Sequence, residues 1–318
     1  MRPQFKIILI SFLISLPFWW GTNLLGEGLE EFFYWQRVSK SPQLLAAQIG
    51  LEERLREIRP VRENDVQGFE LNAKSGISVF VSDDGREKVL FEKDPDQRLP
   101  FASLTKLMTA WVVLEYYDLS KEITVSREAV SQEEDFGKLE TGNVFPTEYL
   151  LYPLLMESSN DAAFALASDY EDMTERKFVE LMKWEAEKMN LEQTFFDNAT
   201  GLDPEESGTR LNYSSSKDLA KLVERLLKKP LVWEISSTEK YNSYGPELVN
   251  NNELLGQIPG LVGGKTGYTA EAGECMILVL RAPKNQGYLI NVILGTGVGN
   301  KFAEMKELVN WLDLAYRW

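Results

Sequence analysis

The chain has no histidine and a single cysteine, Cys275, among its 318 residues. The absence of histidine excludes a Ser-His-Asp triad, so any serine nucleophile in this chain would need another base. The same shortages remove the ligands that transition metals prefer. A carboxylate site for Mg²⁺ or Ca²⁺ is compatible with the composition, but no EF-hand spacing indicates one. One cysteine also excludes an intramolecular disulfide. We therefore expect no cofactor, no metal and a fold stabilised by its core.

Basic residues are also fewer than acidic ones, with 34 Lys and Arg against 49 Asp and Glu. The formal net charge is −15, which repels phosphate backbones, and no basic patch interleaved with aromatic residues offsets it. We therefore exclude nucleic acid as a partner. A hydrophobic content of 44% and a charged content of 26% are typical of a globular protein. The length suits one large domain with an appendage, or two small domains.

The N-terminus carries the longest uncharged hydrophobic run. Arg2 and Lys6 precede residues 7–26, a stretch of 20 residues in the sequence IILISFLISLPFWWGTNLLG, which is long enough to cross a bilayer. The alternative is a cleaved signal peptide, but no Ala-x-Ala-like site follows closely. We interpret residues 1–26 as a signal-anchor or signal peptide, favour the uncleaved anchor, and expect the remainder to be exported and held at the cell membrane.

Residues 27–67 combine an aromatic patch with a charged, weakly helical stretch. We interpret them as a stalk or linker, the alternative being the first helix of the next domain. Residues 68–318 are then the main domain.

Within the main domain, β-branched alternation and turn residues predict strands, and spacing of three to four predicts helices. The predicted strands form two hairpins, at residues 77–82 with 88–92 and 275–281 with 288–295. The predicted helices are at residues 103–117, over most of 120–235, and at 301–316. Strands at both ends with helices inserted between them predict an α+β fold, in which helices flank one antiparallel sheet beside a mainly helical lobe.

The pattern Ser-x-x-Lys is weak evidence by itself. With 21 serines and 20 lysines, chance predicts about 1.3 occurrences. Three occur, at Ser103/Lys106, Ser214/Lys217 and Ser237/Lys240. The second pair is explained by a capping box of Ser215 and Asp218 before a helix, and the third lacks a helical apolar pattern.

Ser103 differs in its surroundings. It follows Pro100 at the start of an apolar helix, where unpaired N–H groups and the positive dipole end lie. Residues three apart share a helix face, so the Lys106 amine can reach the Ser103 oxygen. In a chain without histidine, Lys106 is the strongest candidate base. The alternative is a capping Ser103 with a solvated Lys106.

The segment Lys265-Thr266-Gly267 occurs once, directly after two glycines. Glycine lets another backbone approach closely, which suits a sheet edge that receives an extended substrate. Lys265 and the Thr266 hydroxyl could then bind a terminal carboxylate. The alternative is a glycine-rich turn with an exposed lysine.

Ser158-Ser-Asn160 is the least distinctive segment, because small polar residues before a helix are usually caps. Its functional interpretation is a hydroxyl that relays a proton and an amide that fixes Lys106.

In this order the three segments resemble the low-molecular-mass penicillin-binding proteins that act as serine-type D-Ala-D-Ala carboxypeptidases. The resemblance covers about residues 70 to 318. It extends to further phrases, namely Arg98-Leu-Pro-Phe-Ala-Ser103, Phe196-Asp-Asn198-x-x-Gly201-Leu202, Ser214 to Leu219, Asn250-Asn-Asn252 and Lys265-Thr-Gly-Tyr-Thr-x-x-Ala-Gly273. It implies a β-lactamase/transpeptidase-like fold and a serine DD-peptidase domain at residues 68–318.

The resemblance also implies roles for the first two motifs. Ser103 attacks the carbonyl between the two D-alanines of a peptidoglycan stem peptide, Lys106 is the base, and Ser158 and Asn160 assist. Penicillin-like β-lactams are then inhibitors that acylate Ser103.

For the third motif, the resemblance implies substrate binding by Lys265, Thr266, Gly267 and Tyr268. The backbone N–H groups of Ser103 and Tyr268 form the oxyanion hole.

Three alternatives are open. A β-lactamase shares fold and chemistry, but no Glu followed three and four residues later by Leu-Asn is present. A D,D-endopeptidase attacks a bond that also follows a D-alanine. A non-catalytic cell-wall or β-lactam sensor is least favoured, since a binder needs no base. Many relatives continue into a β-rich domain, which we expect to be absent here.

Overall fold

The structure is a computed structural model that describes residues 60–133, 137–203 and 211–318. The predicted anchor at 1–26 and most of the predicted stalk lie outside the described residues. The chain divides into two compact units, residues 1–61 with Arg317 and residues 62–316 with Trp318. The five-stranded sheet and its covering helices belong to the second unit. Among the described residues, no helix combines the length and the apolar character needed to cross a membrane.

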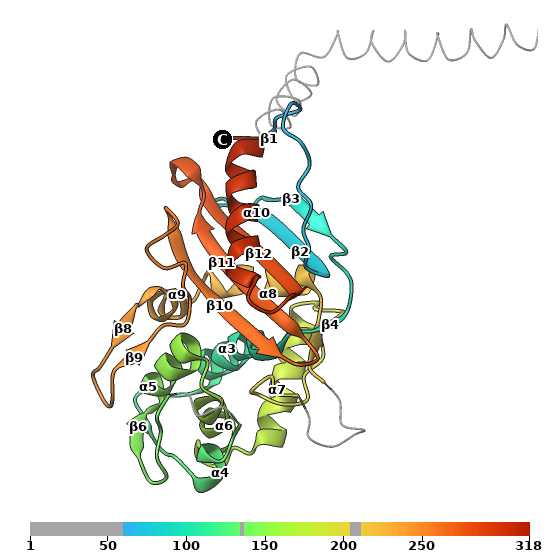
Figure 1. Ribbon diagram of the computed structural model, residues 1–318. Helices are drawn as coiled ribbons and strands as arrows, with labels where there is room; N and C mark the ends of the chain where they lie inside the picture. Colours follow the sequence, from blue (N-terminus) through green and yellow to red (C-terminus); the bar gives the residue numbers. More distant parts are fainter. Residues whose placement is uncertain (1–59, 134–136, 204–210) are drawn as a thin grey trace, which may run out of the picture. The chain divides into compact units, whose positions relative to one another are not determined.

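An antiparallel sheet of five strands forms the centre of this unit, in the order β10-β11-β12-β2-β3 (Figure 1). Its strands are β2 (Ser75–Ser82), β3 (Glu87–Lys93), β10 (Leu261–Thr269), β11 (Gly273–Arg281) and β12 (Gly287–Thr296). Both predicted hairpins are confirmed: Val81 pairs with Glu87 and Arg281 with Tyr288. The pairing of β12 with β2 joins the two ends of the domain. The predicted α+β class is therefore correct.

The side-chain pattern did not predict β10, although the functional interpretation placed Lys265-Thr266-Gly267 at a sheet edge, which β10 is. Gly263, Gly264 and Gly267 interrupt the alternation of side chains on which strand prediction depends. The strand forms nevertheless, because its backbone pairs with β11 from Leu261↔Leu280 to Thr269↔Gly273.

The predicted helices at 103–117 and 301–316 are confirmed with small changes of their ends, whereas residues 120–235 are less helical than predicted, because loops and the short strands β5, β6 and β7 separate their helices. They are α3 (Lys106–Tyr116), α4 (Arg127–Val130), α5 (Thr147–Tyr152), α6 (Asn160–Ser168), α7 (Glu175–Lys188), α8 (Ser216–Leu226), α9 (Pro230–Ser237) and α10 (Lys301–Ala315). Shorter helical turns are η1 (Ala102–Thr105), the π-helical η2 (Pro153–Glu157) and η3 (Pro283–Asn285). Two-residue and three-residue strands complete the set: β1 (Val61–Arg62), β4 (Leu99–Pro100), β5 (Glu122–Thr124), β6 (Val144–Pro146), β7 (Tyr213–Ser214), β8 (Lys240–Tyr241), β9 (Leu248–Val249) and β13 (Tyr316–Arg317).

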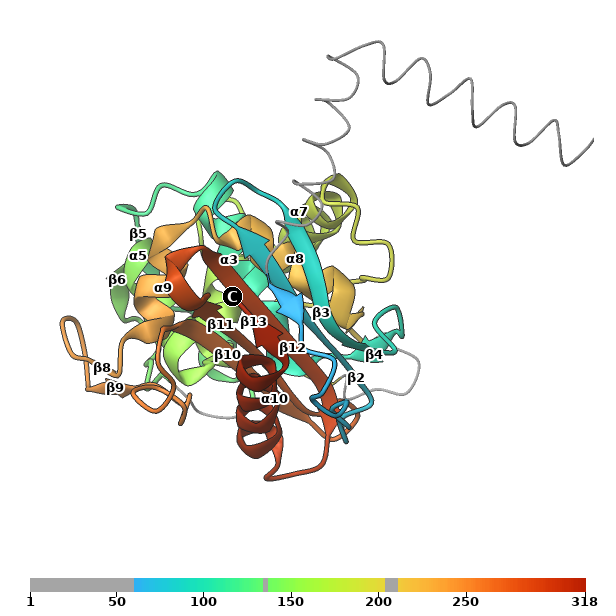
Figure 2. The same ribbon diagram turned by 90° about the horizontal axis from the view of Figure 1, so that it is seen from above.

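Both faces of the sheet are covered at its centre, so β11 and β12 are nearly continuous apolar runs, whereas the edge strand β3 is largely polar. Ile77 and Val79 of β2 belong to the core under α8 and the helical lobe, whereas Phe80 belongs to the core under α10. Figures 1 and 2 show α10 on one face, with α8 and α3 on the other. Successive strand residues point to opposite faces, so each face receives its own apolar set.

The helical lobe contains α3 to α7, and α3 leads into it from the sheet. This helix is apolar around most of its circumference: Leu107, Met108, Ala110 and Val113 are all buried. A helix that is hydrophobic on all sides belongs inside a domain. Its first turn is therefore held firmly where the lobe meets the sheet.

Candidate active site

The three sequence motifs meet in one cleft of about 420 Å³. Ser103 comes from η1, Ser158 follows η2, and Thr266 and Gly267 lie on β10. The cleft is lined by Ser103, Gly137, Lys138, Glu157, Ser158, Val249, Asn251, Thr266, Gly267, Tyr268 and Lys301. Lys106, Asn160 and Lys265 lie directly behind this lining, as their hydrogen bonds show.

The side chain of Lys106 is completely buried (0% exposed) at the first residue of α3. Its Nζ donates to Ser103 Oγ at 2.9 Å, to Asn160 Oδ1 at 2.6 Å and to the Thr200 carbonyl at 2.7 Å. A neutral amine has two N–H donors, which suffice for Asn160 and Thr200, and its lone pair is then free to accept the proton of the Ser103 hydroxyl. The alternative of a solvated helix charge is therefore wrong.

The turn that carries Ser103 is strained and supported from outside. Ala102 adopts a φ of +50°, which is unfavourable for a residue with a side chain. Gly201 lies against this turn with a φ of +86°, and a Cβ there would be 2.1 Å from the Ala102 carbonyl oxygen. Only glycine fits this backbone approach. Gly201 therefore keeps the loop that bears the Thr200 carbonyl in contact with the Ser103 turn.

Sequence analysis did not identify Asn212 as part of this support. This buried side chain donates from Nδ2 to Thr105 Oγ1 and to the Asn198 carbonyl, both at 3.0 Å. Its Oδ1 accepts from the Asp197 N–H at 2.6 Å. Thr105 is 107 residues away along the chain, so no local pattern could have indicated the contact.

Ser158 and Lys265 form the second polar pair of the cleft. Ser158 ends η2 with a φ of +67°, and its Oγ accepts a hydrogen bond from Lys265 Nζ at 2.7 Å. The Lys265 side chain is 1% exposed, and loss of hydration lowers its pKa to about 7. The alternative of an exposed lysine on a turn is therefore wrong.

Asn160 is the first residue of α6, and its amide joins two parts of the site. Oδ1 accepts from Lys106, while Nδ2 donates to the Glu133 carbonyl at 2.8 Å. The capping role belongs to Ser159, whose Oγ accepts from the Ala162 N–H at 3.1 Å. Ser158 and Asn160 are thus left to contact the two buried lysines.

Gly267 brings the edge strand β10 against the turn that carries Ser103. A Cβ at this position would lie 3.1 Å from the Ser103 nitrogen and 3.2 Å from the Phe101 carbonyl oxygen. The next residue, Tyr268, lines the cleft and is 47% exposed. On the other side of Gly267, the Thr266 hydroxyl donates to Asn251 Oδ1 at 3.0 Å. The backbone of β10 thus borders the cleft beside Ser103.

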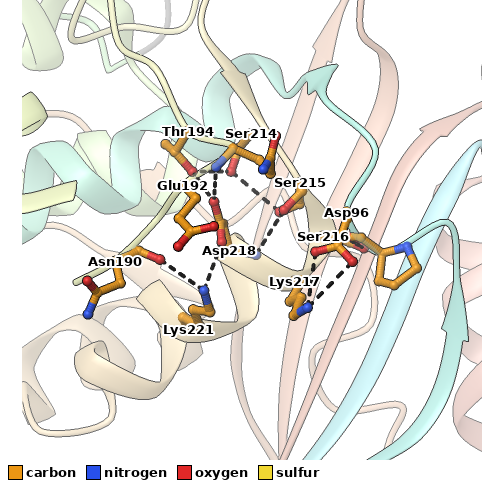
Figure 3. Close-up of polar contacts among 12 residues, drawn as sticks. Asp96, Asn190, Glu192, Thr194, Ser214, Ser215, Ser216, Lys217, Asp218 and Lys221 are labelled. Atoms are coloured by element: carbon orange, nitrogen blue, oxygen red, sulfur yellow. Dashed lines mark hydrogen bonds and ion pairs between the residues drawn. The ribbon is translucent and has the colours of Figure 1, made fainter. Parts of the chain in front are cut away.

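The other Ser-x-x-Lys pairs have different surroundings. Figure 3 shows that Ser214 and Lys217 point to separate partners. Ser214 Oγ is buried and bonds to Thr194 Oγ1 at 2.8 Å, while Lys217 is half-exposed and pairs with Asp96 at 3.1 Å. A serine without an adjacent base cannot act as a nucleophile.

The predicted capping box at α8 is correct in one half. Ser215 Oγ accepts from the Asp218 N–H at 3.1 Å. The Asp218 carboxylate instead accepts from the Gln193 N–H at 2.7 Å. It also accepts from Lys221 Nζ at 3.2 Å, a contact drawn in Figure 3. The box is incomplete because tertiary contacts use the carboxylate.

Comparisons with known proteins agree with this geometry. A family model described as D-alanyl-D-alanine carboxypeptidase, peptidase S11, matches residues 62–297. The D-alanyl-D-alanine carboxypeptidase DacF of Bacillus subtilis is 32% identical over 256 residues, covering 77% of this chain and 62% of the relative. A D-alanyl-D-alanine endopeptidase of Pseudomonas aeruginosa is 30% identical over 246 residues. The match covers 74% of this chain and 76% of that relative. The chain thus spans less than two thirds of the length of the Bacillus relative.

Among solved structures, penicillin-binding protein D2 from Listeria monocytogenes in its cefotaxime-bound form superimposes with a TM-score of 0.64 at 28% identity. The match covers 78% of this chain and 99% of that one. The fold is thus that of the penicillin-binding proteins, as predicted. Since the family model covers most of the domain and includes all three motifs, the chain belongs to the D-alanyl-D-alanine carboxypeptidase family, peptidase S11.

Proposed function

We propose that this protein is a serine-type D-Ala-D-Ala carboxypeptidase that removes the terminal D-alanine from peptidoglycan stem pentapeptides through an acyl-enzyme on Ser103. The observation that carries the proposal is the contact of 2.9 Å between Ser103 Oγ and the buried Lys106 Nζ, at the wall of a cleft bordered by an edge strand. This pair supplies a nucleophile and a base in a chain without histidine.

In the acylation step, neutral Lys106 accepts the proton of Ser103 as its oxygen attacks the carbonyl carbon between the two D-alanines. The C–N bond of the tetrahedral intermediate then breaks, and the departing amine of D-alanine takes up a proton. Ser158 lines the same cleft and accepts a hydrogen bond from Lys265 behind it across 2.7 Å, and this pair relays the proton. Water subsequently hydrolyses the ester, with Lys106 as the base.

The substrate lies along β10 as an additional extended strand. The backbone N–H groups of Ser103 and Tyr268 stabilise the oxyanion, a pair in which each donor contributes about 3 kcal/mol to lowering the barrier. Lys265 and the Thr266 hydroxyl bind the terminal carboxylate, while Gly267 leaves room for the peptide backbone. The closeness of Gly267 to the Ser103 nitrogen supports this arrangement.

Penicillins and related β-lactams acylate Ser103 in the same way and inhibit the enzyme. The cefotaxime-bound Listeria structure, with 28% identity, supports this part of the proposal. Endopeptidase activity on crosslinks is the second candidate function, because the Pseudomonas relative is named an endopeptidase. No cofactor or metal takes part in the proposed steps.

The proposal extends to location and domain organisation. A family that acts on the cell wall requires export, and the uncharged run at residues 7–26 supports a membrane anchor or signal there. Residues 27–67 then form the stalk, and residues 68–318 the catalytic domain on the outer side of the membrane.

The test is acylation of the full-length protein by a fluorescent penicillin, together with release of D-alanine from a diacyl-D-Ala-D-Ala peptide. We expect stoichiometric labelling that Ser103→Ala abolishes and the matched control Ser214→Ala retains. Labelling that survives Ser103→Ala would refute the assignment. Wild-type labelling without D-alanine release would favour a sensor, and cleavage confined to crosslinked muropeptides would favour the endopeptidase.

A further inference from the structure

The Glu157 carboxylate joins two segments that line the active-site cleft. Oε2 accepts a hydrogen bond from the Gly137 N–H at 3.0 Å, and Oε1 accepts one from the Val249 N–H at 2.8 Å. The two donors are 20 and 92 residues from Glu157 along the chain. Both line the cleft, as does Glu157 itself. Hydrogen bonds to an ionised carboxylate are about twice as strong as neutral ones.

The first segment can reach Glu157 only because it contains a glycine. Gly137 has a φ of +92°, and a Cβ there would lie 2.8 Å from Ser159 Oγ and 2.9 Å from Pro153 Cβ. The following residue provides a second link between the same segments, since Lys138 Nζ donates to the Glu247 carbonyl at 3.0 Å. Residues 137–138 and 247–249 therefore form one wall of the cleft, which we call the Glu157 wall.

The second segment is the end of the β8–β9 hairpin, which Figure 1 shows extending from α9 beside α5. Directly after it, the Asn251 N–H donates to the Met156 carbonyl at 3.0 Å, and Asn251 Oδ1 accepts from Thr266 of β10. The Glu157 wall is thus connected to the turn that holds Ser158 and to the strand proposed to bind substrate. A displacement of the wall would change the width of the cleft.

We propose that Glu157 is a positioning residue for the peptide substrate: it holds the Glu157 wall against the part of the stem peptide that precedes the scissile bond. This inference rests on the proposed carboxypeptidase function. Glu157 acts through the two backbone segments, so it sets the fit of the substrate while the reacting atoms remain with Ser103, Lys106 and Ser158. Its loss should consequently affect KM more than kcat.

The test compares two substitutions in the full-length protein. Glu157→Gln keeps the size of the side chain and one acceptor oxygen, but its NH₂ group faces an N–H donor, so one of the two bonds is lost. Glu157→Ala loses both. We expect kcat/KM for the diacyl-D-Ala-D-Ala peptide to fall about tenfold and about a hundredfold respectively, mostly through KM. The control Glu148→Gln, an equal charge change at an exposed position on α5, should leave both constants unchanged.

Hydrogen exchange supplies an independent measurement. At least one of the amide protons of Gly137 and Val249 should exchange faster in Glu157→Gln than in the wild type or in the control, and both should do so in Glu157→Ala. The final number of penicillin molecules bound per chain of Glu157→Gln should equal that of the wild type. This result would show that the variant is folded. Unchanged exchange at both amides, or a fall in kcat at constant KM, would overturn the inference.

These outcomes separate the two proposals. If the wild type releases no D-alanine, the proposed function fails while the exchange data still decide whether Glu157 holds the wall. The rate of penicillin acylation in Glu157→Gln then replaces KM as the measure of fit. An unchanged rate would overturn the positioning role, and a rate reduced about tenfold would support it.

Discussion

Lys265 Nζ lies 2.7 Å from Ser158 Oγ, at the end of a side chain that the protein buries almost completely. Its hydrogen-bond partners among the described residues are a hydroxyl and the Thr266 carbonyl, and neither carries a charge. Burial without a counter-ion lowers its pKa to about 7. Lys265 can therefore both hold an anion and exchange a proton at physiological pH.

This pKa predicts how activity depends on pH. If the Lys265 cation binds the substrate carboxylate, deprotonation above about pH 7 weakens binding, so kcat/KM for the peptide should fall on the alkaline side. Arginine stays protonated throughout this range. In Lys265→Arg the alkaline fall should therefore disappear below pH 9, whatever the absolute activity. Rates of D-alanine release between pH 5 and 10 measure this, and an identical fall in both proteins would contradict the assigned role.

We expect substitution of Gly201 to reduce both the stability of the protein and its acylation. In Gly201→Ala the new Cβ collides with the Ala102 carbonyl at a left-handed backbone position, so we expect the free energy of unfolding to fall by about 3 kcal/mol. Acylation by penicillin should slow more than tenfold, because the Ser103 turn is displaced. Urea titration and labelling kinetics measure the two effects.

Gly142→Ala is the matched control. Gly142 has nearly the same φ, +87°, but no atom lies within 4 Å of the added Cβ. It should lose only the cost of the left-handed conformation, about 1 kcal/mol, and should label at the wild-type rate. Equal effects at the two glycines would show that the contact with Ala102 is unimportant.

We expect a difference in stability between the wild type and Glu185→Gln that depends on pH. Burial alone would raise its pKa, but hydrogen bonds from Lys188, Tyr116 and Trp111 outweigh this and lower it. A lowered carboxyl pKa stabilises the fold above the unfolded value near 4.3, and this contribution is lost as pH falls through the folded pKa. Glu185→Gln should thus destabilise the protein at pH 7 by about 2 kcal/mol, with a smaller difference from the wild type at pH 3. Guanidinium titrations at both pH values test this, and a constant difference would contradict it.

The reactivity of the Cys275 thiol should report unfolding of the protein. The thiol is completely buried on β11, and burial raises its pKa to about 12. Because the thiolate is the reactive form, the native protein at pH 8 should not react with a disulfide reagent over an hour. In denaturant one thiol per chain should react within minutes. Rapid reaction of the native protein would show that β11 opens readily.

The elements predicted correctly are those whose signals are local. The β2–β3 and β11–β12 hairpins have β-branched or apolar strands with turn residues between them, and α10 has a regular apolar spacing. The bounds of the edge strand β10 were not predicted, because its glycines carry no side-chain pattern and its pairing with β11 is a tertiary contact; only its Lys265-Thr266-Gly267 segment was expected at a sheet edge.

The same distinction applies to the candidate site. Its motif residues are recognisable because chemically distinctive groups occur at fixed spacing. Asn212 and Glu157 were missed because their partners lie up to 107 and 92 residues away. A polar residue whose contacts are all distant resembles any surface residue in the sequence.

The sequence by itself determined that no histidine could serve as the base, and that Ser103 and Lys106 would share one helical face. Their spacing of three residues is a property of local backbone geometry. Only the tertiary structure decided which of three such pairs is buried beside a cleft. Thr200 and Asn160 surround Lys106 with acceptors, whereas Lys217 extends to the surface. Burial results from the packing of distant segments, and spacing along the chain does not encode it.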